Sequence, residues 1–175
     1  IDGAVTLGSD VSLILADGAN LKIEDGISGK GTHITVDGCT VQGTLGNGIR
    51  LDGMEITVQN CRVTYVGKSG IHVTGGNVEK LIRANNLIYN NYVSHWSIVS
   101  GIYEMAISSR SSCGTVISHN EICNSVDWGI EIAGAYNTVE YNYCHDLCLF
   151  QGDQAVIHVC TTYGGIVRYN YIRNA

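Results

Sequence analysis

The stretch NTVEYNYCHD, residues 137–146, has near copies at GIVRYNYIRN (165–174) and GTVISHNEICN (114–124). Each copy places an aliphatic residue three positions before an Asn and an apolar residue or Cys two positions after it. Copies that begin 20 to 30 residues apart indicate a protein of stacked coils. The remaining copies are centred on Asn91 (88–93), on Cys61 in VQNCRV (58–63), on Cys39 in VDGCTV (36–41) and on Ala19 in ADGANL (16–21).

A second phrase, a small residue followed by Ile-x-apolar, falls between these copies. Strand alternation places its Ile inside and the x residue outside. The expected inner column is Ile49, Ile71, Ile107, Ile130 and Ile157. The expected outer column is Arg50, His72, Ser108, Glu131 and His158, with Glu131 and His158 as vertical neighbours.

One such coil cannot bury its own apolar face, whereas stacked coils can, because each strand pairs with its equivalents above and below. A buried Asn at each turn can then bond the turn backbone and the Asn of the next coil. The sequence therefore predicts an all-β fold, a single-stranded right-handed parallel β-helix of about seven coils. The domain spans 1–175 and is expected to belong to a longer chain. The Asn residues expected in one column are Asn91, Asn120, Asn142 and Asn170.

The amino-acid composition argues against several other folds and binding partners. The 175 residues include 22 Gly and no Pro, and Leu is too rare for a leucine-rich repeat. A β-sandwich is the rival fold, but it predicts hairpin turns rather than one recurring frame. The net charge of −6 argues against nucleic-acid and anionic-membrane partners. The seven Cys form no CxxC pair, so we expect buried thiols, with one disulfide left open.

Several acidic residues lie on the outer face of the expected Ile-x-apolar strands or just before these strands begin. Glu104, Asp127, Glu131 and Asp153 fall in three consecutive coils, and we expect them on one exposed face with His158. Neighbouring carboxylates raise one another's pKa, as a general acid requires. The predicted catalytic pair is Asp153 with Glu131 or Asp127, and His158 would orient a carboxylate or share its proton.

A second group of residues predicts saccharide binding beside that pair. Aromatic faces commonly stack on sugar rings, and neighbouring polar groups bond the hydroxyls. No cofactor is expected, since Asp146 with Asp153 is thin support for a Ca²⁺ site. The predicted substrate-binding residues are His72, Trp96, Tyr103, Glu104, Arg110 and Trp128.

From about Val58 onward, the order in which particular sequence segments follow one another is more specific to one protein family than the repeated Asn-centred stretches are. These segments include YVGKSGIHVTGG (65–76), WGIEIAGAYNTVEYNYCHDLC (128–148) and GDQAVIH (152–158). This order resembles bacterial right-handed β-helix proteins of the pectate-lyase-like superfamily, closest to β-helix glycoside hydrolases acting on polysaccharides. The resemblance implies a secreted protein with two catalytic Asp residues. The first matches Asp153, and the second would lie beyond Ala175. The family's acidic pair is reduced here to Gly152-Asp153, and its Arg-Asp-Trp stretch is CTTY (160–163).

Three functions stay open. A glycoside hydrolase, or part of one, would use paired carboxylates on a polysaccharide. A lyase acting on a polyuronate needs Lys or Arg, and the expected acidic groove would repel its substrate. A non-catalytic glycan-binding or structural rod is the third. Because the last coil ends without a polar cap, we expect further coils or another domain to cover that end.

Overall fold

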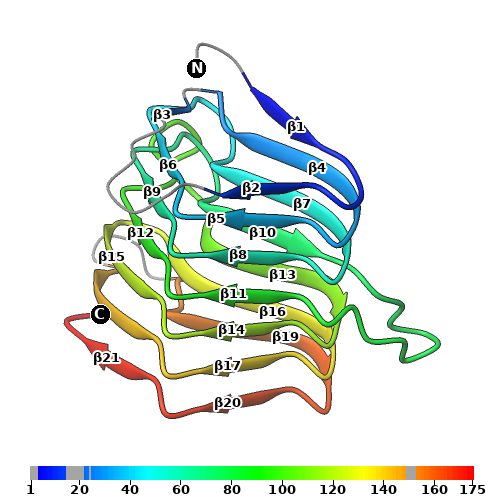
Figure 1. The fold of residues 1–175 in the computed structure, drawn as a ribbon. Helices are drawn as coiled ribbons and strands as arrows, with labels where there is room; N and C mark the ends of the chain where they lie inside the picture. The colour runs from blue at the N-terminus through cyan, green and yellow to red at the C-terminus, as the bar shows by residue number, and fades with distance from the viewer. Residues whose placement is uncertain (1–3, 15–21, 24, 149–152) are drawn as a thin grey trace.

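A computed structural model describes residues 4–14, 22–23, 25–148 and 153–175. These residues form seven coils of three short strands each, and Figure 1 shows the coils stacked in chain order. They contain no helix, and hence none long and apolar enough to cross a bilayer. All pairs between the strands are parallel, which excludes the β-sandwich and confirms the predicted parallel β-helix.

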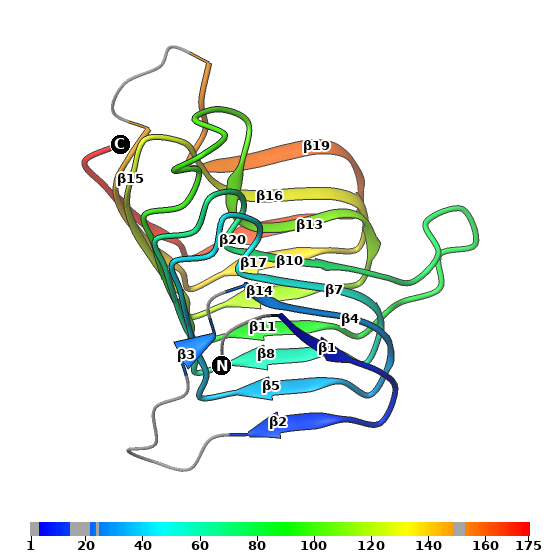
Figure 2. The same cartoon turned by 90° about the horizontal axis from the view of Figure 1, so that it is seen from above.

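The first sheet carries the Ile-x-apolar phrases. Figure 2 shows its strands lying above one another, with those of the second sheet stacked in the same way. After its fourth strand, residues 71–74, and before the next strand of the second sheet, residues 87–89, a loop projects from the stack in both views. The bridge between Asn77 and Ile82 pairs the two arms of this loop. In order, the strands are β1 (Val5–Leu7), β4 (Ile27–Thr32), β7 (Ile49–Met54), β10 (Ile71–Thr74), β13 (Met105–Cys113), β16 (Trp128–Ala135) and β19 (Ile157–Tyr163).

We call the repeated six-residue stretch centred on Asn the Asn frame. Its first residues lie in the second sheet and its last residues lie in the third sheet. The second sheet consists of β2 (Ser12–Ile14), β5 (Thr35–Asp37), β8 (Thr57–Gln59), β11 (Leu87–Tyr89), β14 (Val116–Ser118), β17 (Thr138–Glu140) and β20 (Ile166–Arg168). The third consists of β3 (Lys22–Ile23), β6 (Thr40–Gln42), β9 (Arg62–Thr64), β12 (Tyr92–Ser94), β15 (Glu121–Ser125), β18 (Tyr143–Leu147) and β21 (Tyr171–Arg173).

The strand register confirms both predicted columns of the first sheet. Ile71 pairs with Ile49 and Ile107, and Ile130 pairs with Ile107 and Ile157, so these side chains stack inside the helix. The outer column is equally continuous, because Glu131 pairs with Ser108 on one side and with His158 on the other. A one-residue slip would have exchanged the two columns, so the repeated phrase determines which residues face outward.

The Asn column is also confirmed. Asn91, Asn120 and Asn142 each donate from Nδ2 to Oδ1 of the next Asn at 2.9 Å, and the last acceptor is Asn170. Upstream, the backbone N–H of Cys61 donates to Oδ1 of Asn91 at 2.9 Å, so a thiol continues the column. All seven Cys are free and five are buried, as expected of small buried thiols.

One part of the repeat assignment falls elsewhere than predicted. The copy expected at residues 16–21 lies outside the described residues. In the first coil, Leu13 pairs with Val36 and Ile23 pairs with Val41, so those two residues occupy the frame positions. The two frame positions of the first coil are therefore further apart in the sequence than those of the other coils. A search for the six-residue pattern could not find them.

Strands β20 and β21 lie at the C-terminal end of the stack (Figure 1). Every residue of these two strands is exposed. Val167 and Ile172 are 44% and 47% exposed, although their equivalents in the two preceding coils, Val139 and Ile117 for the first and Cys144 and Ile122 for the second, are buried. The exposed apolar end predicted from the sequence is therefore present in this chain.

Candidate functional site

Two adjoining hollows lie over the outer face of the first sheet, and we call them together the sheet-1 groove. They share Arg50, His72 and Arg110. The first encloses about 230 Å³ and the second about 340 Å³. The other residues of the first are Asn47, Lys68, Ser69, Tyr103, Glu104, Met105, Ser108 and Glu131, and those of the second are Asp52, Thr74, Gly75, Gly76 and Ser111.

The insertion at residues 95–104, between β12 and β13, forms one wall of the groove. Trp96 anchors it: the indole is 1% exposed within the core, and its Nε1 donates to the carbonyl of Glu104 at 3.2 Å. The prediction that Trp96 contacts substrate is therefore wrong. Tyr103, at the far end of the insertion, is 62% exposed and lines the groove, and its contact with substrate stays a prediction.

Asp127 is the second anchor of the insertion, and its predicted exposed position is also wrong. Its carboxylate is fully buried. Oδ2 accepts from Ser97 Oγ at 2.9 Å and from the backbone N–H of Glu104 at 2.8 Å, while Oδ1 accepts from its neighbour Trp128 N–H at 2.9 Å. A carboxylate that is enclosed by three donors holds the wall in place and does not face substrate.

Glu104 reaches the groove from the end of this anchored insertion. Its Oε2 accepts from Ser69 Oγ at 2.5 Å, and its Oε1 accepts from Ser100 Oγ at 3.2 Å. Ser69 also accepts from the backbone N–H of Met105 at 3.2 Å. The Glu104 carboxylate is thus held in one orientation by groups from two coils.

Glu131 faces outward, as its strand position predicts, but its side chain is only 1% exposed. Ser108 Oγ donates to Oε2 at 3.3 Å. Arg110 Nε and His158 Nδ1 lie 3.6 and 3.4 Å from Oε1, without forming a hydrogen bond to it. A buried carboxylate oxygen without such a bond is costly, and it marks a place where a ligand or water group would fit.

His72 occupies the middle of the outer column. Burial, and then the positive charge of Arg50, hold the pKa of His72 below its ordinary value of 6.5, while Glu131 and Glu104 act in the opposite direction. A neutral imidazole is therefore favoured at neutral pH. It can therefore accept a proton in a site that also holds arginine and lysine side chains.

The charge of the groove differs from the acidic surface expected from the sequence. Its cations are Arg50, Lys68 and Arg110. Two carboxylates line the first hollow, Glu104 and Glu131, and the second adds Asp52, which pairs with Lys30 at 3.0 Å. The expectation of an acidic groove fails because Asp127 is buried and Asp153 does not line either hollow.

The remaining predicted residues lie at or beyond the edge of the groove. The ring of Trp128 is 4.3 Å from that of His158 and 6.4 Å from that of Tyr103, so the three form an aromatic edge above Glu131. Asp153 is exposed, and within the described part of the chain it makes no hydrogen bond or ion pair. The predicted catalytic pair of Asp153 with Glu131, and a catalytic role for Asp153, stay predictions.

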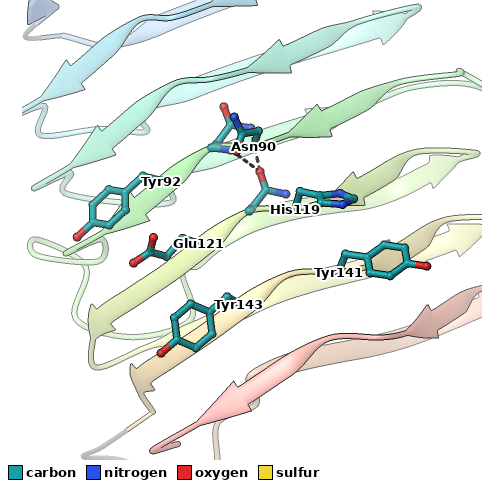
Figure 3. A pocket seen from close by; sticks show the side chains of 8 residues that line it. Asn90, Tyr92, His119, Glu121, Tyr141 and Tyr143 are labelled. Atoms are coloured by element: carbon teal, nitrogen blue, oxygen red, sulfur yellow. Dashed lines mark hydrogen bonds between the residues drawn. The ribbon is translucent and has the colours of Figure 1, made fainter.

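Sequence reasoning missed another hollow, of about 370 Å³, along the turn between the second and third sheets (Figure 3). It is lined by the residues on either side of the Asn column, including His119, Glu121, Tyr141 and Tyr143. The rings of Tyr141 and His119 stack with centroids 5.1 Å apart. The recurring polar or aromatic residues beside the frame Asn, as in YNY, were the signal that could have revealed it.

Comparison with known proteins agrees with the coil architecture. A protein-family model described as a right handed beta helix region matches residues 25–175. No curated protein and no solved structure matches the chain.

Proposed function

The chain belongs to the right-handed β-helix family, and from this premise we propose that it is a carbohydrate-active domain whose sheet-1 groove binds an acidic polysaccharide. The observation that carries the proposal is the set of three cations, Arg50, Lys68 and Arg110, around a hollow with two carboxylates. Guanidinium groups bind carboxylates in a bidentate manner, so a uronate fits this set better than a neutral sugar. We also propose that the protein acts outside the cell, where such polymers occur.

The groove supports elimination as its chemistry. An Arg paired with the uronate carboxylate would stabilise the charge that develops when the neighbouring carbon loses its proton. His72, favoured in its neutral form, would take that proton as general base. The C–O bond to the leaving sugar would then break as the C=C bond forms, and the exposed Tyr103 hydroxyl would protonate the leaving oxygen.

Hydrolysis is the second candidate, because Glu104 and Glu131 line the same hollow. Two carboxyl groups facing one cavity are the usual requirement of glycoside hydrolysis. Glu131, buried next to Arg110 and His158, and Glu104 would be the two carboxyl groups of that reaction. Both candidates place a saccharide in the same groove.

Incubating the chain with a polyuronate and, separately, with a neutral glucan distinguishes elimination from hydrolysis. Elimination produces an unsaturated uronate that absorbs in the ultraviolet, whereas hydrolysis produces new reducing ends without that absorbance. We expect the ultraviolet signal with the polyuronate. New reducing ends from the neutral glucan alone would overturn the elimination proposal in favour of hydrolysis.

Binding is measured separately, by calorimetry with short uronate oligomers. Arg50→Gln and Arg110→Gln should each weaken binding about 10- to 100-fold, the usual effect of a lost charge-assisted hydrogen bond. Arg83→Gln, on the projecting loop outside the groove, is the matched control. Equal affinity for neutral and acidic oligomers, or no effect of either groove variant, would contradict the proposed site.

A further inference from the structure

A cluster of mixed ligand types lies on the outer face of the third sheet, away from the sheet-1 groove. Glu121 and Cys123 are two residues apart on β15, so alternation places both on the same face. His145 on β18 pairs directly with Cys123. One potential ligand atom from each of the three lies within 4.8 Å of the other two.

The imidazole of His145 is held in place from two sides. Its Nδ1 lies 2.7 Å from Asp146 Oδ2, and its ring stacks on Tyr143 with centroids 4.4 Å apart. The other nitrogen, Nε2, lies 3.3 Å from Glu121 Oε1. If Nδ1 donates its hydrogen to Asp146, the neutral ring turns a lone pair towards a carboxylate. That contact is repulsive unless a proton or a metal ion lies between the two atoms.

The surroundings of the thiol fit the same arrangement. Cys123 is 1% exposed, and its Sγ lies 3.5 Å from Tyr92 Oη and 3.2 Å from Asn124 Nδ2. Both groups can donate to a thiolate. Glu121 lies between Tyr92 and Tyr143 on the neighbouring strands and borders the hollow of Figure 3.

We propose that Glu121, Cys123 and His145 form a binding site for a divalent transition metal ion, with Zn²⁺ as the best match, and that Asp146 orients His145. A metal-bound His commonly donates its second N–H to a carboxylate, as His145 is placed to do towards Asp146. Sulfur, nitrogen and oxygen together suit Zn²⁺, whereas Ca²⁺ and Mg²⁺ prefer oxygen ligands only.

The separations are close to what zinc requires. Metal–ligand distances of about 2.0–2.3 Å with tetrahedral angles put two ligand atoms about 3.3–3.7 Å apart. The three ligand atoms lie within 4.8 Å of one another, and the Glu121 side chain is 47% exposed, which leaves it room to turn towards the other two. Three protein ligands leave a fourth position for water or for a ligand group in the adjoining hollow.

The test is calorimetric titration of the chelator-treated, reduced chain with Zn²⁺, together with absorption spectra after adding Co²⁺. We expect one ion per chain and a thiolate-to-cobalt absorption band. Cys123→Ser should abolish that band, and Cys123→Ser, His145→Gln and Glu121→Gln should each weaken Zn²⁺ binding at least tenfold. Asp146→Asn should weaken it about 10- to 100-fold without changing the stoichiometry.

Two variants serve as matched controls: Cys160→Ser, a half-buried thiol on β19, and His119→Gln, on the neighbouring turn. Both should bind Zn²⁺ like the parent, and far-ultraviolet circular dichroism should show that every variant keeps its β-structure. No binding by the parent chain, or binding that survives all three ligand substitutions, would overturn the proposal.

Discussion

At the scale of single residues, the Asn column links the coils through side-chain amides. Asn120 contacts the coil on each side. Its Oδ1 accepts from the backbone and side-chain amides of Asn91, and its Nδ2 donates to the carbonyl of Ile88 and to Asn142. The residue before each frame Asn adopts a left-handed conformation, with φ of 58° at His119 and 55° at Tyr141. The buried amide bonds the backbone that this tight turn leaves unpaired.

Asn120→Ala should destabilise the protein by about 2–6 kcal/mol, because two buried donors of Asn91 lose their acceptor at about 1–3 kcal/mol each. Urea unfolding followed by circular dichroism measures the change. Asn170→Ala is the matched control, since Asn170 occupies the same column in the last coil but is only partly buried, so water can replace the lost bonds. Equal losses for the two variants would contradict a role for burial.

At the scale of elements, the insertion at residues 95–104 explains which site predictions failed. Alternation along a strand predicts whether a side chain faces inward or outward, and it did so for Glu131 and His72. It does not predict what folds over the outer face. The burial of Trp96 and Asp127 depends on how the insertion contacts residues about 30 positions away, such as Ser97 with Asp127. A pattern confined to short windows carries no signal for contacts of that range.

Asp127→Asn should loosen this insertion while leaving the three sheets intact. The amide has one acceptor oxygen in place of two, so it cannot satisfy all of Ser97, Glu104 N–H and Trp128 N–H. We expect chymotrypsin to cut after the exposed Tyr103 several-fold faster in the variant, as followed by mass spectrometry. Glu79 is an exposed carboxylate on the projecting loop, and we expect chymotrypsin to cut the Glu79→Gln variant at the parental rate. An unchanged rate in Asp127→Asn would mean that Trp96 alone anchors the wall.

At the scale of the whole molecule, each described strand pairs with its equivalents in the coils above and below, so stability is close to a sum over neighbours. That is why the sequence predicted so much of the fold: one register, repeated, places Ile71, Ile107 and Ile130 in line without any other long-range information. The charge of the groove was not predictable in this way. The charge of the groove depends on which carboxylates are buried, as Asp127 is beneath the insertion.

The same one-dimensional organisation predicts a gradient of hydrogen exchange along the stack. Strands β11 and β14 have coils on both sides and buried Ile88 and Ile117, so their amides should exchange slowest. Strands β20 and β21, whose residues are all exposed, should exchange orders of magnitude faster. Exchange measured by mass spectrometry at two protein concentrations tests this. Slow exchange of β20 and β21 at both concentrations would contradict the gradient. Protection that grows with concentration would instead show a second copy of the chain covering the exposed Val167 and Ile172, because unpaired strand edges associate.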